Sequence, residues 1–96
     1  MRQYEVAYIV HPDLDETAFA EVNDRIKDLI EKGDGKVTKV DLWGKKRLAY
    51  EIRKQREGQY VFLQTEMPPV LCSELERNLT LLEPIMRFMI TQVDEE

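Results

Sequence analysis

A cluster of basic residues near the middle of the sequence is the feature best suited to binding a ligand. Between residues 36 and 56 there are eight basic side chains against two acidic ones, Asp41 and Glu51. The basic residues are Lys36, Lys39, Lys45, Lys46, Arg47, Arg53, Lys54 and Arg56. The segment therefore carries a charge of +6, and the rest of the chain −11, within a net charge of −5. Such a separation is typical of a protein that binds an anionic partner at one place.

Trp43 lies inside this basic segment. Cationic side chains neutralise phosphates, and an aromatic ring stacks on a base or a ribose. If the segment forms one strand, its residues fall on two faces. One face then holds Lys39, Trp43, Lys45, Arg47 and Arg53, and the other holds Val40, Leu42, Leu48, Tyr50 and Ile52. Gly44 predicts a bulge or a close approach of another backbone, and a bulge would shift this parity. The alternative is a solvated edge strand whose lysines prevent pairing with another sheet.

Residues that commonly carry catalysis are scarce in this sequence. His11 is the one histidine and Cys72 the one cysteine, which excludes an internal disulfide and a cysteine-based zinc site. We interpret His11 as a loop residue and Cys72 as a small apolar side chain in a helix. The stretch 33–35 lacks the third glycine and the lysine of a phosphate-binding loop. The sequence therefore predicts a protein that is not an enzyme, with no catalytic residue and no metal site.

Length and composition fit one small globular domain. The chain has 96 residues, of which 43% are hydrophobic and 34% charged, within the globular range. We expect a single domain over residues 1–93 and a short acidic tail over 94–96. No apolar run is long enough to span a bilayer, and the N-terminus lacks the pattern of a signal peptide. We therefore expect a cytoplasmic protein with no membrane partner. Because catalytic residues are scarce, we also expect no small-molecule substrate.

The first half of the sequence predicts a strand, a helix and a long strand. Residues 4–10 are rich in β-branched and aromatic side chains, and Asp13 with Glu16 resembles a capping box for the helix that follows. One apolar stripe runs along that helix: Phe19, Val22, Ile26, Leu29 and Ile30. Glycines at 33–35 end the helix, and residues 36–53 are predicted to be extended.

The second half predicts a strand, a helix and a last strand. We expect residues 54–58 to be a polar hairpin connection and 59–67 to be a strand. Pro68 and Pro69 then begin a helix. Its apolar stripe is Leu71, Leu75, Leu79 and Leu82. Pro84 ends this helix, and residues 85–93 form the final strand.

This order predicts a ferredoxin-like α+β sandwich, βαββαβ, with a four-stranded antiparallel sheet and two helices on one face. Function is then expected on the open face of the sheet or at its edges. Residues 56–62 lack the basic-Gly-aromatic order of the common sheet-face RNA-recognition domain. If RNA is the ligand, we therefore expect a different mode of binding.

Four blocks of the sequence resemble one family. The stretch 44–53, GKKRLAYEIR, resembles the signature of the bacterial small-subunit ribosomal protein S6 family at each position. Residues 1–5 resemble the family's opening, 66–68 its entry to the second helix, and 87–89 its last strand. The resemblance covers nearly the whole chain. It implies a structural, non-catalytic protein of the small ribosomal subunit that has no cofactor. Such a protein binds the central domain of small-subunit ribosomal RNA as a heterodimer with ribosomal protein S18.

The resemblance also implies site residues, carried over by position. RNA-facing residues would be Arg2, Lys45, Lys46, Arg47 and Arg87. The open sheet face would serve the protein partner, with Trp43, Tyr60 and Phe62 as apolar contacts. Two other classes of function stay open. One is a protein-binding adaptor whose basic strand contacts an acidic partner, and the other is a metabolite-sensing ferredoxin-like module.

Overall fold

The computed structural model describes residues 2–52 and 54–93, so Arg53 and the predicted acidic tail lie outside the described residues. It contains the six predicted elements in the predicted order. They are β1 (Arg2–Val10), α1 (Glu16–Lys32), β2 (Lys36–Ile52), β3 (Gln55–Met67), α2 (Pro69–Leu81) and β4 (Ile85–Gln92).

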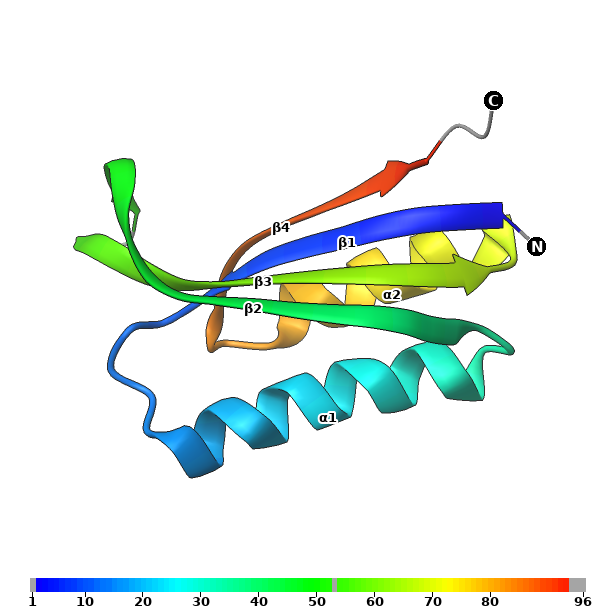
Figure 1. Cartoon of the computed structure of the whole chain (residues 1–96), viewed down its shortest axis with the longest axis horizontal. Coiled ribbons are helices and arrows are strands. Elements are labelled where there is room, and N and C mark those ends of the chain that lie inside the picture. The colour runs from blue at the N-terminus through cyan, green and yellow to red at the C-terminus, as the bar shows by residue number, and fades with distance from the viewer. Residues whose placement is uncertain (1, 53, 94–96) are drawn as a thin grey trace.

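The four strands form one antiparallel sheet in the order β2-β3-β1-β4. Both helices pack on the same face of this sheet, α1 nearer β2 and α2 behind the central strands (Figure 1). This is the predicted ferredoxin-like βαββαβ sandwich. The chain passes from β1 through α1 to the edge strand β2, and from β3 through α2 to the opposite edge strand β4. We call the face without helices the open face.

The core lies between the helices and every second residue of the central strands. β1 contributes Val6 and Tyr8, and β3 contributes Val61 and Leu63, all at most 2% exposed. The helix residues that close this core are Ile26, Ile30, Leu71, Leu75 and Leu79. Both predicted apolar stripes therefore face the sheet, because residues three or four apart lie on one side of a helix. Leu82, the last residue of the second stripe, is only partly buried.

Helix α1 begins two residues later than its sequence pattern predicts. The N-cap is Asp15, whose side-chain oxygen accepts a hydrogen bond from the Ala18 backbone N–H at 2.8 Å. The predicted capping role of Asp13 is therefore wrong. Instead, the Asp13 backbone N–H donates to His11 Nδ1 at 3.2 Å, so Asp13 belongs to the turn that follows β1. Two aspartates two residues apart offer the same capping chemistry, and the exit of the chain from β1 selects the second.

The β2–β3 hairpin is longer than predicted. Gln55–Gly58, expected to be a connection, belong to β3, and Ile52 pairs with Gln55 across a tight turn. Lys54 in this turn has φ 65°, a left-handed conformation typical of short hairpin connections. The polar composition of residues 54–58 results from solvent exposure of the hairpin end and not from loss of strand structure.

The pairing of strand β2 with β3 changes register at three places: two bulges described next, and a longer irregularity between Arg47 and Ile52. Thr38 has no cross-strand partner between Val37 and Lys39, and Trp43 has none between Leu42 and Gly44. Gly44 has φ 75°, which a residue without a Cβ adopts at little cost. The predicted bulge at Gly44 is therefore confirmed, and no other backbone approaches the position closely. Each bulge moves the residues after it to the opposite face of the strand.

Candidate functional site

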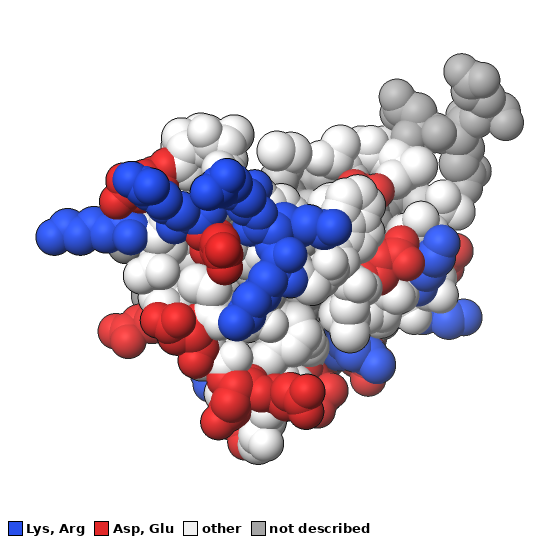
Figure 2. Space-filling model, turned by 60° about the vertical axis from the view of Figure 1, so that its left-hand side comes forward, with Lys and Arg blue, Asp and Glu red and all other residues white. Residues whose placement is uncertain are grey.

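The end of the β2–β3 hairpin extends beyond the rest of the sheet. The pairing of β1 with β3 stops at Val10 and Gln59. Strands β2 and β3 pair beyond this row as far as Arg47 and Glu57, and again at Ile52 and Gln55 after a register shift. We call residues 46–58 the hairpin end. Its described basic residues are all exposed: Lys46, Arg47, Lys54 and Arg56. Figure 2 shows Lys and Arg side chains gathered at this end of the molecule, while Asp and Glu predominate below them, towards α1. The hairpin thus separates the basic segment from the acidic remainder in space.

The hairpin end curves over the open face instead of continuing the plane of the sheet (Figure 1). Tyr50 of β2 meets Arg87 of β4, the strand at the opposite edge, with the guanidinium carbon 5.7 Å from the ring centroid. Leu48 is 8% exposed beneath this curve. A Cβ built on Gly58 would lie 2.2 Å from Ile9 Cγ2. Gly58 therefore packs closely against the Ile9 side chain where the hairpin end joins the sheet.

The bulge at Trp43 corrects the predicted face assignment. Leu42 lies opposite Val61, on the helix-packed face. Trp43 instead stacks on Phe62 of the open face, with ring centroids 4.6 Å apart. Beyond the bulge, Lys45 lies opposite Gln59. Gln59 is two residues from Val61 on β3, so Lys45 lies on the side of the helix-packed face.

Two groups predicted to share a face are therefore split. Lys45 and Arg47 lie on the opposite side of the strand from Trp43, and Lys46, between them in the sequence, lies on the same side as Trp43. Leu48 and Tyr50 lie on the side of the open face, whereas Val40 and Leu42 do not. The prediction of cations and indole on one face is wrong for Lys45 and Arg47, since the bulge inverts the alternation after Leu42, whereas Lys39 lies opposite Gln64 on the same face as Trp43. The cations instead surround the hairpin end on both sides.

An apolar hollow of about 250 Å³ opens on the open face beside the hairpin end. Its lining comes from the three strands β1, β3 and β4, and consists of Ala7, Tyr8, Ile9, Tyr60, Phe62, Arg87, Phe88 and Met89. The structure thus brings together Tyr60 and Phe62, two of the predicted partner contacts, and the third, Trp43, stacks on Phe62. Trp43 and Met89 are 57% and 59% exposed, so a large apolar surface at this site faces solvent.

The structure separates Arg2 from the other predicted RNA-facing residues. Arg2 lies opposite Met67 at the far end of β1, whereas Val10 at the other end lies level with Gln59 and Lys45. Arg2 and Val10 are eight positions apart on β1, which corresponds to roughly 26 Å along the strand. Arg87, by contrast, lies opposite Ile9 and reaches the hairpin end. Lys45, Lys46, Arg47 and Arg87 therefore form one cationic region, and Arg2 lies outside it.

The residues considered for catalysis have structural surroundings. His11 lies in the loop after β1, where its backbone N–H donates to the Pro84 carbonyl and its own carbonyl accepts from Gln59 Nε2. Cys72 packs against the core from α2, as predicted. Burial raises the pKa of Tyr8, whose hydroxyl donates to Asn23 Oδ1. Within residues 2–52 and 54–93, no group of three metal-ligating side chains is found, and no helix there is long and apolar enough to cross a membrane.

Sequence reasoning missed three contributors to this region: Tyr50, Ile9 and Met89. Simple alternation groups Tyr50 with Val40 and Leu42, whereas in the structure it lies over the open face, beyond the bulge at Trp43 and within the irregular stretch between Arg47 and Ile52. Ile9 and Met89 are apolar residues in strands predicted from composition, and alternation along β1 and β4 could have placed them on the face opposite Tyr8 and Phe88. The contact between Tyr50 and Arg87 has no sequence signal, because it joins the two edges of the sheet.

Comparisons with known proteins agree on one family. The family model described as Ribosomal protein S6 matches residues 3–92. The chain is 45% identical over 96 residues to small ribosomal subunit protein bS6 of Moorella thermoacetica, covering 100% of this chain and 98% of that protein. It is 43% identical to bS6 of Mycobacterium tuberculosis, covering 99% of each.

A solved structure gives the same result for the fold. The crystal structure of 30S ribosomal protein S6 from Thermotoga maritima superposes with a TM-score of 0.91 at 30% identity. The match covers 96% of this chain and 87% of that chain. A family match over nearly all described residues, close relatives of the same length and the shared fold lead to one assignment: the chain belongs to the bacterial ribosomal protein S6 family.

Proposed function

We propose that the chain binds small-subunit ribosomal RNA as a heterodimer with ribosomal protein S18, with the RNA on the hairpin end and S18 on the open face. Membership of the family makes the chain a small-subunit ribosomal protein and not an enzyme. The observation that carries the proposal is the adjacency of two unlike surfaces. The cationic hairpin end meets the apolar hollow at Arg87, which lines the hollow and contacts Tyr50.

The hairpin end, with Lys45 at its base, has the properties of a phosphate-binding surface. Lys45, Lys46 and Arg47 are exposed, and none of them has an ion-pair partner among the described residues. Because they point to alternate sides of a protruding strand, they can reach phosphates on more than one side of it. Cations that neutralise phosphates release condensed counterions, so binding is expected to fall steeply with salt.

The open face has the properties of a protein-binding surface. Its hollow is lined by aromatic and aliphatic side chains, and Trp43 and Met89 add exposed apolar area at its margin. Exposed apolar patches with a polar surround are typical of protein interfaces, and aromatic residues are enriched at their centres. Trp43, Tyr60 and Phe62 are accordingly proposed as contacts for S18.

The acidic remainder of the chain supports binding of RNA as a heterodimer. Outside residues 36–56 the charge is −11, which repels RNA and favours a basic protein partner. We therefore expect weak RNA binding by the isolated chain and tight binding by the pair. Arg2, about 26 Å along β1 from the hairpin end, is proposed as a separate and secondary RNA contact.

The test is RNA binding with and without S18 over a salt series. The RNA is a fragment of the central domain of small-subunit ribosomal RNA. The variant changes Lys45, Lys46 and Arg47 to alanine. A matched control changes three exposed cations on the helices, Arg25, Lys32 and Arg77, and so removes the same charge. Loss of about three phosphate contacts lowers the slope of log affinity against log salt by roughly 2 to 3.

The outcomes separate the alternatives. S18-dependent binding whose salt slope falls in the hairpin variant and not in the control supports the proposal. Equal loss in both variants would indicate only a general effect of net charge. No RNA binding under any condition, with folded protein and S18 present, would favour the protein-binding adaptor. A rise in melting temperature on adding a metabolite would favour the ligand-sensing module.

A further inference from the structure

The open face has a second, polar region beyond the apolar hollow. A groove of about 330 Å³ lies at the end of the sheet far from the hairpin end. Its open-face residues include Gln3, Glu5, Gln64 and Glu66. Glu5 and Gln64 adjoin the hollow, because Ala7 and Phe62, two residues away on the same strands, line it. Glu5 is the charged residue of the two. A partner lying along β1 on this face would therefore cover both Glu5 and the hollow.

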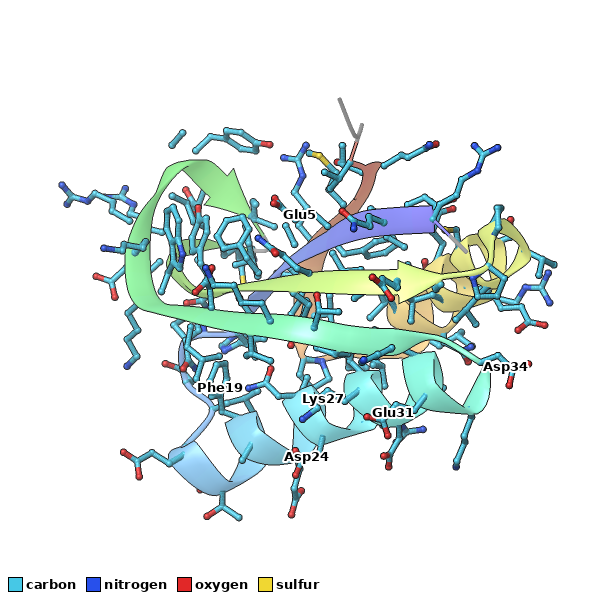
Figure 3. The ribbon with its side chains drawn as sticks, turned by 45° about the vertical axis from the view of Figure 1, so that its right-hand side comes forward. Glu5, Phe19, Asp24, Lys27, Glu31 and Asp34 are labelled. Carbon is cyan, nitrogen blue, oxygen red and sulfur yellow. The ribbon has the colours of Figure 1, made fainter. Side chains whose placement is uncertain are left out.

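Glu5 is a partly exposed residue whose carboxylate has no cation beside it. Its cross-strand neighbours are Gln64 on β3 and Thr91 on β4, both uncharged. Lys39 lies in the same row, two strands and about 10 Å away, and its Nζ is 3.8 Å from Asp41 Oδ2 instead. Across residues 2–52 and 54–93, no ion pair is formed by Glu5. Figure 3 labels Glu5 over β1, on the opposite side of the sheet from α1.

Covering such a carboxylate has a defined energetic consequence. In the free protein, water solvates the exposed part of Glu5. A partner that seats an apolar side chain in the adjoining hollow removes much of this water, and an ionised carboxylate buried without a counter-charge is strongly unfavourable. The covering surface must therefore provide a cation or hydrogen-bond donors at this position. A cationic side chain restores the interaction best, since hydrogen bonds between charged groups are stronger than neutral ones.

We propose that Glu5 is the specificity contact of the open face and receives a lysine or arginine side chain of the protein partner, beside an apolar side chain of the same partner segment in the hollow. This inference rests on the proposed function, because it assumes that S18 covers the open face. Ala7 and Ile9 are two and four residues from Glu5, which corresponds to roughly 7 to 14 Å along the strand. For an extended partner segment, the cation and the apolar residue are then two to four positions apart.

The test measures the affinity of the full-length chain for purified S18 by titration calorimetry. The variants are Glu5→Gln, which keeps the shape and removes the charge, and Glu5→Lys, which reverses it. The control is Glu21→Lys, an exposed position on α1 with the same change of net charge. We expect Glu5→Gln to weaken binding about thirtyfold or more and Glu5→Lys at least a hundredfold, as for loss of one member of a covered charge pair. The control is expected to change the affinity less than threefold.

Replacement of each lysine and arginine of S18 by glutamate then identifies the partner cation. One such replacement should restore binding to the Glu5→Lys chain while weakening binding to the wild type. Equal affinity of wild type and Glu5→Gln, or equal losses in Glu5→Lys and Glu21→Lys, would overturn the inference and leave the proposed function standing. Failure of wild type to bind S18 would instead overturn the proposed function. Thermal melting of each variant confirms that it is folded.

Discussion

The two faces of the sheet are built from the same alternating pattern but differ in what covers them. On the helix-packed face, Val6, Val61 and Leu63 are at most 1% exposed beneath α1 and α2. On the open face, Tyr60 and Phe62 are only half-buried, and Met89 is 59% exposed. Hydrophobicity alone therefore does not separate residues that stabilise this fold from residues that bind a partner.

The difference lies in when each surface loses its water. Apolar area is worth about 25 cal/mol per Å² when it is removed from water. The helix-packed face gains this free energy on folding, whereas the open face retains most of it for association. A substitution on one face should then change the free energy of unfolding, and a similar substitution on the other should change affinity. Glu5 and Arg87 also lie on the open face, so substitutions of these two charged residues should change affinity more than the free energy of unfolding.

The largest effect expected from this comparison is at Leu75, which is fully buried on α2. Leu75→Ala removes packed methyl groups and leaves a cavity, which costs about 2 to 5 kcal/mol. The matched change on the open face is Met89→Ala, expected to alter the free energy of unfolding by less than about 0.5 kcal/mol, as for most exposed positions. Urea unfolding of both variants, followed by circular dichroism, gives the two values. Similar losses at both positions would remove the distinction between the faces.

A smaller effect is expected where the hairpin end is seated on the open face. A Cβ at Gly58 would lie 2.2 Å from Ile9 Cγ2, and this branched side chain is held on β1 beside the hollow. Gly58→Ala should therefore displace the hairpin end and cost about 1 to 3 kcal/mol by overpacking. Because the hairpin end carries Lys46 and Arg47, RNA affinity should fall as well.

Gly44→Ala is the control for Gly58. Gly44 has φ 75° and no heavy atom near its added Cβ, so the cost there is the backbone term alone, about 1 kcal/mol. Equal urea midpoints for Gly58→Ala and the wild type would show that the hairpin end is not held by this contact.

Most of the fold could be predicted from the sequence, because each element has a strong local signal. The apolar stripes of both helices, the prolines at 68 and 69, and the order of elements were sufficient for the ferredoxin-like topology. The end of the hairpin was predicted less well, since the polar residues 55–58 have the composition of a loop while pairing as a strand. The start of α1 was misplaced because Asp13 and Asp15 are equivalent as caps when only the sequence is considered.

The candidate site was predicted in its residues but not in its geometry. Gly44 predicts either a bulge, which would shift the alternation, or a close approach of another backbone, and the sequence does not decide between them for Lys45 and Arg47. Whether an extra residue inverts a strand depends on cross-strand pairing, which is not local information. The contact of Tyr50 with Arg87 depends further on the curvature of the hairpin over three strands. Glu5 gave no signal, because an unpaired carboxylate is recognised only when its neighbours in space are known.

The smallest effect at neutral pH, and the one that changes sign, is expected at Tyr8 on the helix-packed face. Tyr8→Phe removes the hydrogen bond to Asn23 and should cost about 1 kcal/mol at pH 7. Burial raises the pKa of Tyr8, so in alkali the unfolded chain loses this proton before the folded one does. The wild type should therefore lose up to about 1.4 kcal/mol per pH unit from this group above pH 10. The phenylalanine variant lacks that loss, and its stability should equal and then exceed that of the wild type as the pH rises. Urea midpoints at pH 7, 10 and 11.5 measure the difference. A constant difference over this range would show that Tyr8 ionises equally readily in both states, and that the helix-packed face does not exclude water at this position.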